Sequence, residues 1–494
     1  MSTVKQVSHP GCLQELKRLG LKTAVHLTVS NERIMQTNEL TEKLAFMRAY
    51  FKTGVTKPYA FRIEQLKKLK AAIYKYEQEL HEALYADLKK SKEESWVTET
   101  GMVIAEISAM EKELKQWMQP QRVSTNLLNL PSSSKVYSEP LGVVLIIGPF
   151  NYPFQLLINP LLGAIAAGNC AVLKASEYAS ATAAVIKKLI EEIFTPEYVL
   201  VQDGIGAEVV PAMMNEFTFD HVFFTGSIPT GKAIYKMAAE RLVPVTLELG
   251  GKSPCVVESD ANIKVAARRI AVTKFSNAGQ MCVAPDYVLV HETKKQQLVE
   301  ELKKCIVQFY SDAPADSYNF GKIINEKQFD RVASYLSSGN ILHGGRTNRE
   351  QLFIEPTLLE NVSLSSPIMQ DEIFGPVLPI LTFKTMDEAL KMIEQHPNPL
   401  SFYVYTESSA KEKNWIEAIP FGGGCVNNSS WHLTNHNLPF GGRGFSGTGK
   451  YHGKYSFDTF SHQKAVMKTP SWFDPSIKYP PFKGKLGLFK MVIR

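Results

Sequence analysis

The loop at residues 275–285 carries a cysteine in a setting that suits chemistry. Cys282 follows the small, flexible pair Ala278-Gly279 and precedes Pro285. Gly279 lets the backbone approach a neighbour closely, and Pro285 resists a continuing helix. Such a loop can hold a thiol at the mouth of a site, although free cysteines are more commonly small buried hydrophobic residues. Cys282 is therefore a candidate nucleophile whose surroundings must be found elsewhere in the chain.

Two polar side chains could supply those surroundings. Glu248 lies inside the apolar run at 245–249, where a carboxylate is unfavourable unless it is paired. Desolvation would raise its pKa toward a value that suits a general base, whereas a buried salt bridge is the structural alternative. Asn151 follows the buried run at 141–147. Its amide could donate to a developing oxyanion, or it could simply be a turn residue.

A glycine-containing turn could bind phosphate. The segment at 225–232 contains Gly226, Ser227 and Gly231, and it lies between an expected strand and an expected helix. Phosphates bind in this context, at helix N-termini. The glycines are not spaced as G-x-G-x-x-G, so a plain strand–turn–helix connection is the alternative.

Two further motifs place polar groups at the ends of expected elements. Lys174 and Glu177 follow the strand at 170–173, at the sheet edge where doubly wound folds bind ligands. Lys174 could meet ribose or phosphate oxygens and Glu177 a ribose hydroxyl, unless they form a surface pair. Glu372 and Phe374 offer a carboxylate and a ring in one turn, for which a loop anchor is the alternative.

The elements that must position these groups alternate between short apolar strands and helices. Strands are expected at 141–147, 170–173, 198–201, 221–224, 244–249, 287–290, 376–382 and 401–405. Helices are expected at 154–167 (kinked or restarted at Pro160), 179–194, 228–241, 296–310 and 388–395. This alternation predicts an α/β protein whose parallel sheets carry helices on both faces.

Composition excludes several classes of protein. The 494 residues exceed the roughly 250–300 at which one core stops growing, so at least two domains are expected. A net charge of +6 with no dense basic run argues against nucleic-acid binding. Six scattered cysteines without metal-ligand spacing predict no metal site and a reducing, cytoplasmic location. No apolar run is long enough to span a membrane, and no signal peptide is recognisable.

The motifs together resemble the aldehyde dehydrogenase superfamily. Glu248 stands in Leu-Glu-Leu-Gly-Gly-Lys-Ser-Pro, and Gln-Met-Cys282 follows it at the family's distance. Other family motifs occur in the family's order at Asn151, Lys174, 226–231 and 372–376. The stretches at 245–255, 282–287 and 438–462 resemble the class 3 branch, which includes fatty-aldehyde and coniferyl-aldehyde dehydrogenases.

The resemblance implies the aldehyde dehydrogenase fold, with a Rossmann-like dinucleotide-binding domain, a second α/β catalytic domain and a small bridging β arm. It implies oxidation of aliphatic (medium- or long-chain) or aromatic aldehydes to carboxylic acids with NAD or NADP. Cys282 would attack the aldehyde to give a thiohemiacetal and then a thioester, Asn151 would hold the oxyanion, and Glu248 would activate water. The implied cofactor contacts are Lys174, Glu177, Gly226, Ser227, Gly231, Glu372 and Phe374.

Two alternatives remain open at this point. An acylating enzyme would pass the thioester to coenzyme A, which Glu248 argues against. A catalytically silent relative would keep only the fold. Met281 stands where the family usually has threonine or a small residue, so the preferred aldehyde stays open. The choice between NAD and NADP also stays open, because Glu177 would repel a 2′-phosphate and Lys174 would attract one.

The resemblance also implies a division of the chain. The expected parts are an N-terminal extension at 1–37, a dinucleotide-binding domain at 38–120 and 141–247, a catalytic domain at 248–452, oligomerisation strands at 121–140 and 453–475, and a tail at 476–494. The arm and a strand-like stretch at 456–461 predict a homodimer. The tail mixes basic and apolar residues, so peripheral membrane contact is a further hypothesis and an ordinary surface tail the alternative.

Overall fold

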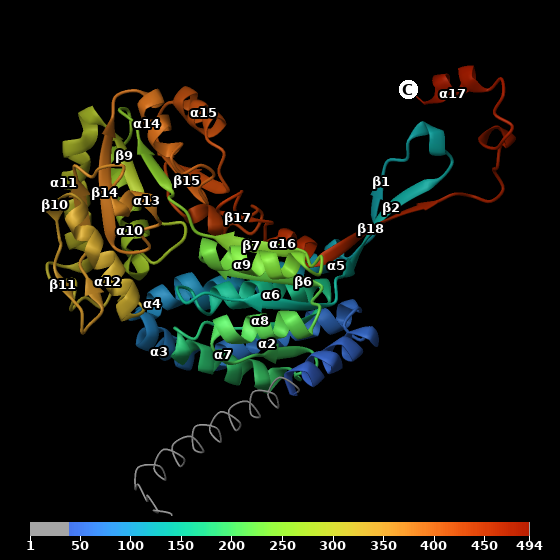
Figure 1. Cartoon of the computed structure of the whole chain (residues 1–494), viewed down its shortest axis with the longest axis horizontal. Coiled ribbons are helices and arrows are strands. Elements are labelled where there is room, and N and C mark those ends of the chain that lie inside the picture. Colours follow the sequence, from blue (N-terminus) through green and yellow to red (C-terminus); the bar gives the residue numbers. More distant parts are fainter. Residues whose placement is uncertain (1–38, 494) are drawn as a thin grey trace, which may run out of the picture.

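The computed structural model describes residues 39–493. Within them the chain forms two large β-sheets surrounded by helices and a small three-stranded sheet that projects from the rest (Figure 1). The two large, mostly parallel sheets confirm the expected α/β class. The predicted extension at 1–37 lies outside the described residues.

The first large sheet has six strands in the order β17-β7-β6-β3-β4-β5. The strands are β3 (Val143–Ile147), β4 (Cys170–Lys174), β5 (Val199–Val201), β6 (His221–Gly226), β7 (Val245–Leu249) and β17 (Gly447–Thr448). Only β17, at the edge, runs antiparallel to its neighbour. Every residue of β3 and β4 is buried, as expected where helices cover both faces of a parallel sheet.

Helices cover this sheet and connect its strands. They are a helix at 39–52, α2 (Tyr59–Lys75), α3 (Glu77–Leu88), α4 (Lys92–Ser95), the π-helix η1 (Trp96–Thr100), α5 (Gly101–Trp117), α6 (Gln155–Ala167), α7 (Ser180–Ile193), α8 (Gly206–Glu216) and α9 (Ile228–Ala239). Right-handed crossovers place α6 and α7 on one face and α8 and α9 on the other.

Helix α6 lies at the centre of the first domain core. It is a single helix with Pro160 inside it, so of the two expected outcomes, a kink or a restart at Pro160, the restart is wrong. All its residues are buried, and it packs against α2, α5 and α16 (Gly453–Thr459). This packing outweighs the backbone hydrogen bond that Pro160 cannot donate, because tertiary burial stabilises helices more than local propensity does.

The second large sheet has seven strands in the order β10-β13-β14-β9-β8-β15-β16. The strands are β8 (Pro254–Val257), β9 (Tyr287–His291), β10 (Asn340–His343), β13 (Thr357–Glu360), β14 (Val377–Phe383), β15 (Ser401–Tyr405) and β16 (Gly423–Val426). Only β10 is antiparallel, and β11 (Thr347–Asn348) and β12 (Phe353–Ile354) form a separate pair. The surrounding helices are α10 (Ile263–Phe275), α11 (Lys295–Tyr310), α12 (Glu326–Ser334), α13 (Pro367–Gln370), α14 (Met386–Ile393) and α15 (Ser409–Ala418).

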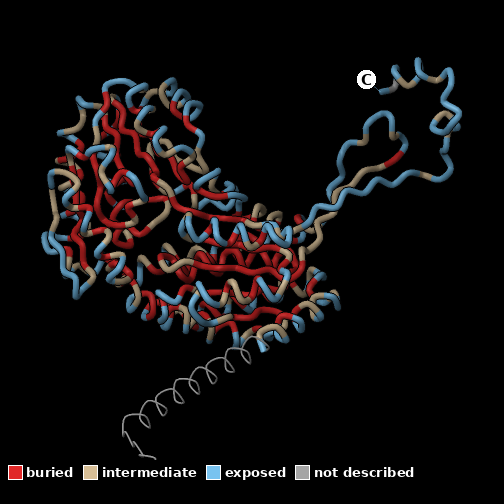
Figure 2. Tube along the Cα trace, in the orientation of Figure 1, coloured by how far each residue is buried: buried red, intermediate tan, exposed pale blue. Residues whose placement is uncertain are grey.

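The third sheet, which we call the arm, joins β1 (Gln121–Val123), β2 (Ser133–Pro140) and β18 (Ser461–Lys468). β2 pairs antiparallel with both neighbours, and its register with β18 runs from Pro140↔Ser461 to Ser133↔Lys468. Figure 2 shows that the arm is mostly exposed, in contrast to the buried layers of the two large sheets.

The predicted strand at 456–461 is wrong in its position. Residues Gly453–Thr459 form helix α16, and the strand begins only at Ser461. Helix α16 packs on α6 at Gly163, where an added Cβ would lie 2.8 Å from Cβ of Ser456. The close approach of α16 to α6 favours the helix. The residues around Phe457 alternate between polar and apolar, a pattern that is typical of a strand and carries no signal of this packing.

The last described residues lie beyond the arm. They contain a short helix, α17 (Leu486–Val492), and many exposed apolar side chains, including Trp472 and Leu486. Among residues 39–493, no helix is both long and apolar enough to cross a membrane.

Candidate active site

The loop that carries Cys282 is held in an unusual backbone conformation. After α10 ends, Asn277, Ala278 and Gly279 have φ values of 50°, 50° and 74°, all in the left-handed region. A Cβ on Gly279 would lie 2.3 Å from the carbonyl oxygen of Gly375, so only glycine fits there. The loop is thereby pressed against the segment that carries Glu372 and Phe374.

Hydrogen bonds from Gln280 fix this loop further. Its Nε2 donates to the carbonyl oxygens of Asn277 (3.0 Å) and Lys322 (2.9 Å), and its Oε1 accepts from the backbone N–H of Ile324 (3.0 Å). On the other side of the cysteine, the Tyr403 hydroxyl donates to the Val283 carbonyl oxygen at 2.6 Å. Cys282 is therefore presented by a rigid backbone.

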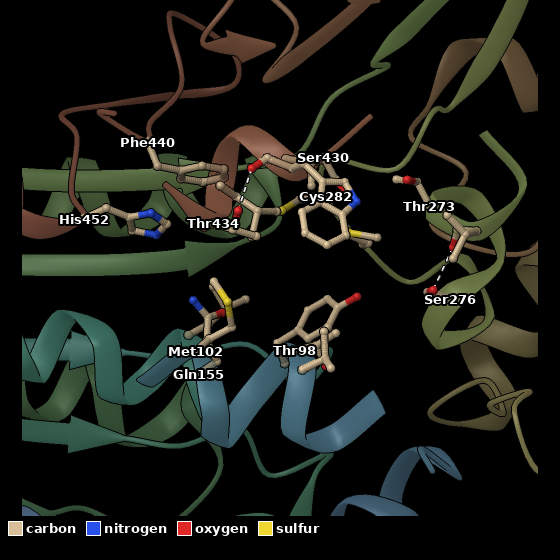
Figure 3. Close-up of a pocket in the computed structure, with 18 of the residues that line it drawn as sticks. Thr98, Met102, Gln155, Thr273, Ser276, Cys282, Ser430, Thr434, Phe440 and His452 are labelled. Atoms are coloured by element: carbon tan, nitrogen blue, oxygen red, sulfur yellow. Dashed lines mark hydrogen bonds between the residues drawn. The ribbon is translucent and has the colours of Figure 1, made fainter. Parts of the chain in front are cut away.

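Cys282 lines an apolar cavity of about 370 Å³. Figure 3 shows Met102, Gln155 and Thr98 on the wall facing Cys282, with Phe440 and His452 on another side. The apolar lining residues include Val97, Met102, Leu156, Val272, Met281, Leu433 and Phe440. A cavity of this size and character suits a small apolar ligand.

Asn151 reaches the cysteine loop from the first sheet. Its Nδ2 donates to the carbonyl oxygen of Gln280 at 3.1 Å, two residues before Cys282. The main-chain oxygen of Asn151 accepts from Lys90 Nζ (2.9 Å) and from Asn277 Nδ2 (2.8 Å). The structure thus brings the predicted oxyanion donor and the cysteine loop together.

A buried ion pair supports the Asn151 loop. Lys90 Nζ donates to Glu99 Oε1 at 2.6 Å, and both side chains are fully buried. The other carboxylate oxygen of Glu99 accepts from the backbone N–H groups of Phe154 (3.1 Å) and Gln155 (2.9 Å), at the start of α6. Glu99 therefore caps the helix that follows Asn151.

Glu248 is buried on β7, and neither of its carboxylate oxygens has a hydrogen-bond partner among residues 39–493. It pairs in the sheet with Gly447 of β17, and a Cβ on Gly441 would lie 3.2 Å from its Oε1. Burial raises the pKa of the Glu248 carboxyl well above its usual value. The alternative of a structural salt bridge is therefore wrong for Glu248.

The two predicted carboxylates, Glu248 and Glu372, both act electrostatically on the thiol of Cys282. Burial raises the pKa of Cys282, and the negative charges of Glu372 and Glu248 raise it further. Burial, the largest of these causes, favours the thiol form, so attack by sulfur requires that a neighbouring group accept its proton.

Glu372 occupies the space that a side chain would take at residue 250. A Cβ on Gly250 would lie 1.7 Å from Oε2 of Glu372, so glycine is required there. Burial and the nearby Asp286 raise the pKa of Glu372 to about 8, although Arg331, Lys252 and Lys274 act in the opposite direction. Lys274 is itself fully buried, and its Nζ has no hydrogen-bond partner in the part of the chain that the structure describes.

Phe374 extends a row of aromatic rings. It packs edge-to-face on Phe150 with ring centroids 5.8 Å apart, and Phe150 packs edge-to-face on Tyr178 at 6.2 Å. Phe150 precedes Asn151, and Tyr178 follows Glu177. The row connects the segment around Glu372 with the end of β4.

Lys174 and Glu177 form a pair at the carboxyl end of β4. Lys174 Nζ donates to Glu177 Oε2 at 3.0 Å, and Glu177 Oε1 accepts from the Gly206 backbone N–H at 3.1 Å. Burial acts to raise the pKa of Glu177, but hydrogen bonds from backbone N–H groups and Lys174 leave it lowered, which favours the anionic carboxylate. Such a pair suits ribose hydroxyls.

The turn at 226–231 opens helix α9. Ser227 is the N-cap residue but makes no side-chain cap, because its Oγ bonds to Thr230 Oγ1 instead (2.9 Å). Gly226 and Gly231 lie close to other residues: a Cβ would lie 2.5 Å from the Phe224 ring and 2.6 Å from Leu249 Cδ2, respectively. Gly231 therefore lets α9 pack on β7, while the N-terminus of α9 offers backbone N–H groups to an anion.

Sequence reasoning missed four residues in or under the site: Lys90, Glu99, Asn277 and Lys274. Charged residues inside otherwise helical segments give no signal of burial, because Lys and Glu are mostly exposed. Asn277 carried a weak signal, since it precedes Ala278-Gly279 and asparagine tolerates left-handed backbone. Its partners lie too far along the chain to be inferred.

Comparisons with known proteins show the family of this chain. A model of the aldehyde dehydrogenase family matches residues 28–466. The 4,4'-diaponeurosporen-aldehyde dehydrogenase of Staphylococcus aureus is 48% identical over 92% of this chain and 99% of its own. The dimeric NADP-preferring aldehyde dehydrogenase of the dog, Canis lupus familiaris, is 40% identical over 91% of this chain and 99% of its own.

A solved structure gives the same result. The substrate-bound state of Staphylococcus aureus AldH superimposes with a TM-score of 0.89 at 48% identity, over 92% of this chain and 99% of that one. The polar pair at β4, the free N-terminus of α9 and the Glu372–Gly250 contact fit a dinucleotide. The chain belongs to the aldehyde dehydrogenase family and is an NAD(P)-dependent oxidoreductase of aldehydes.

Proposed function

We propose that this enzyme oxidises apolar aldehydes, aliphatic with medium or long chains or aromatic, to carboxylic acids through Cys282. One observation carries the proposal: a partly exposed cysteine lines an apolar cavity of about 370 Å³. The carotenoid-type aldehyde in the name of the Staphylococcus aureus relative is also apolar. Met281 lines the same cavity, so its bulk limits the width available beside the sulfur.

In the proposed first step, Cys282 Sγ bonds to the aldehyde carbon to give a thiohemiacetal. The raised pKa of the thiol means that its proton must pass to a neighbouring carboxylate as the bond forms. The two carboxylates that raise the pKa, Glu372 and Glu248, are the candidates to receive it. When bound, NAD(P)⁺ would supply the hydride acceptor, and the adduct on Cys282 would become a thioester as it gives up that hydride.

Asn151 and the Cys282 backbone N–H are proposed to hold the oxygen that becomes negative. Asn151 Nδ2 already donates one hydrogen to Gln280 O, which leaves its second N–H for the substrate. Donors fixed before the reaction stabilise the developing charge without reorganising.

Glu248 is proposed to activate the water that hydrolyses the thioester. A carboxylate without partners and with a raised pKa can take a proton from water as the water attacks. The carboxylic acid leaves, Cys282 regains its proton, and the enzyme is ready for another cycle.

Residues on the first sheet and beside it are proposed to hold the cofactor. Lys174 and Glu177 would bind the adenosine ribose, and the turn with Gly226, Ser227 and Gly231 would receive the pyrophosphate. Glu372 would bind the nicotinamide ribose, and Phe374 would pack beside it. Support comes from the position of each group at the carboxyl ends of parallel strands or against the cysteine loop.

NADH or NADPH absorbance with hexanal and with benzaldehyde tests the proposal. We expect turnover with both aldehydes and at least one cofactor, and none with Cys282→Ala. Equal turnover by the wild type and Cys282→Ala would refute the mechanism. A rate that rises with added coenzyme A would favour an acylating enzyme, and no turnover with any aldehyde would favour a silent relative.

We further propose a cytoplasmic homodimer in which the arm joins the two copies. The support is that one edge of β18 pairs with no other strand of the described residues, and that a relative is named as dimeric. The domain division at 38–120 with 141–247, 248–452, and 121–140 with 453–475 stays a proposal, as does membrane contact by the tail at 476–494. A monomeric mass in solution would contradict the dimer, and failure to bind lipid vesicles would contradict the membrane contact.

A further inference from the structure

Asn277 lies where the two halves of the site meet. Its Nδ2 donates to the main-chain oxygen of Asn151 (2.8 Å) and to the main-chain oxygen of Gln280 (3.1 Å). Asn151 follows β3 of the first sheet, whereas Gln280 belongs to the cysteine loop that leads into β9 of the second sheet. One carboxamide nitrogen therefore connects both parts of the chain.

The direction of the Asn277 carboxamide is fixed by chemistry. Both neighbours, Asn151 O and Gln280 O, are carbonyl oxygens and can only accept hydrogen bonds. An amide oxygen in this position would repel both, so the nitrogen must face them. The side chain is completely buried, where the absence of a donor would be costly.

The rest of Asn277 is also held on several sides. Its backbone N–H donates to Glu94 Oε1 at 2.7 Å, and its backbone oxygen accepts from Gln280 N (3.1 Å) and Gln280 Nε2 (3.0 Å). The residue adopts a φ of 50°, which costs energy for any residue except glycine but least for asparagine and aspartate. Strain that persists at such a point must be compensated by its contacts.

The carbonyl oxygen of Gln280 is shared by two donors. Asn151 Nδ2 and Asn277 Nδ2 both donate to it, each at 3.1 Å. Without Asn277, the Asn151 loop would lose one of its two links to the cysteine loop. The Asn151 amide could then rotate, and its free N–H would point less often at the substrate oxygen.

We infer that Asn277 is a positioning residue, which holds the Asn151 amide in register with Cys282 so that both can meet one oxygen atom. The inference rests on the proposed role of Asn151 as the oxyanion donor. Asn277 acts through Asn151 and the cysteine loop, so it influences the rate of the chemical step more than it influences substrate binding.

The test is a double-mutant cycle on kcat with Asn277→Gly and Asn151→Ala. Glycine removes the carboxamide and also relieves the strain of the left-handed backbone, so we expect the variant to fold. We expect Asn151→Ala to lower kcat about 10²-fold to 10³-fold. Asn277→Gly alone should lower kcat about tenfold with KM within about twofold, since it misaligns this donor without removing it.

In the Asn151→Ala background, adding Asn277→Gly should change kcat less than about twofold. A full tenfold loss there would show that Asn277 acts independently of Asn151 and would overturn the inference. If Asn151→Ala keeps normal kcat, the proposed oxyanion role fails. If Asn151→Ala is impaired but Asn277→Gly is not, only the present inference fails.

Ala278→Gly is the matched control. Ala278 has the same φ of 50° in the same turn, and glycine there loosens the backbone while leaving the Asn277 carboxamide in place. We expect its kcat to stay within about twofold of the wild type. An equal loss in both variants would assign the effect to loop stiffness and overturn the inference.

Asn277→Asp gives a second, independent variant. It tolerates the turn but places an oxygen against Asn151 O and Gln280 O, so kcat should fall at least as far as in Asn277→Gly. Unchanged kcat in a folded Asn277→Asp enzyme would overturn the inference. Thermal melting of each variant identifies loss of fold separately from loss of kcat.

Discussion

Two buried glutamates near the site, Glu99 and Glu248, have opposite surroundings. Glu99 pairs with Lys90 and accepts hydrogen bonds from two backbone N–H groups. Glu248, on a strand of the same half of the molecule, has no hydrogen-bond partner among the described residues. Burial raises the pKa of both carboxyls, but at Glu99 the charge of Lys90 and the hydrogen bonds from Lys90 and two backbone N–H groups oppose that rise, whereas burial is the cause at Glu248.

The different surroundings suit different roles, a structural role for Glu99 and a chemical role for Glu248. A buried charge that is paired and hydrogen-bonded fixes geometry, and removing one partner leaves the other uncompensated. A buried carboxylate without partners is costly to ionise, and such perturbed groups gather at functional sites. Burial alone would not have distinguished Glu99 from Glu248.

The largest expected effect is on activity. Glu248→Gln should lower kcat about 10²-fold to 10⁴-fold, because the amide cannot take a proton from water. If thioester hydrolysis is the step affected, intact-mass spectrometry of the variant with aldehyde and cofactor should detect an acyl group on Cys282. Normal turnover by Glu248→Gln would show that the unpaired glutamate has no chemical role and would contradict the comparison with Glu99.

The second largest effect is on stability, at the paired glutamate. Glu99→Gln should lower the free energy of unfolding by about 3–5 kcal/mol, because Lys90 is left charged, buried and without its counter-charge. Urea denaturation measures this. The double variant Lys90→Met/Glu99→Gln should recover part of the loss, and a loss that is simply additive would show that the pair is not coupled.

The third effect is the contribution that Glu248 should make to the pH dependence of stability. Its pKa in the folded protein lies above that in the unfolded chain, so the folded state binds the extra proton between the two values. Stability is therefore fully present below the unfolded pKa and falls as pH rises toward the folded pKa, by up to about 1.4 kcal/mol per pH unit. Glu248→Gln should remove this slope, so its stability relative to the wild type should increase from pH 5 to pH 8 in thermal melts.

The smallest effect is at an exposed pair, which sets the baseline for the comparison. Lys68 and Glu64 are one turn apart on α2, with N···O 2.8 Å and both side chains about half exposed. Lys68→Gln should cost only about 0.3–0.5 kcal/mol. A cost near that of Glu99→Gln would mean that pairing, regardless of burial, determines stability here.

Much of the fold could be predicted because its strands are buried on both faces. The run that became β3 is apolar throughout, and the turn that contains Gly226 and Ser227 does connect a strand, β6, with a helix, α9, as expected. The residues around Glu248 and Cys282 could be recognised as site residues because each lies in a short sequence motif, and the motifs follow one another in the order typical of the family. Their proximity to one another followed from the family resemblance and not from periodicity.

The rest depended on contacts between distant parts of the chain. Lys90 reaches Asn151 across 61 positions and Glu94 reaches Asn277 across 183, and no local pattern reports such pairs. The helix at Gly453–Thr459 forms because Gly163 lets it approach α6, which overrides an alternating pattern that favours a strand. Tertiary packing of this kind is where local propensity fails.

The arm has a consequence for the order in which the chain is completed. Glu139 on β2 and its partner Lys464 on β18 are separated by 325 positions. At a synthesis rate of about 5–20 residues per second, β2 waits roughly 20–60 s on the ribosome before β18 emerges. During that interval β2 has only the short β1 beside it, so one edge can pair with other nascent chains. The second edge of β2 is therefore covered only after the strands of both large sheets have been synthesised.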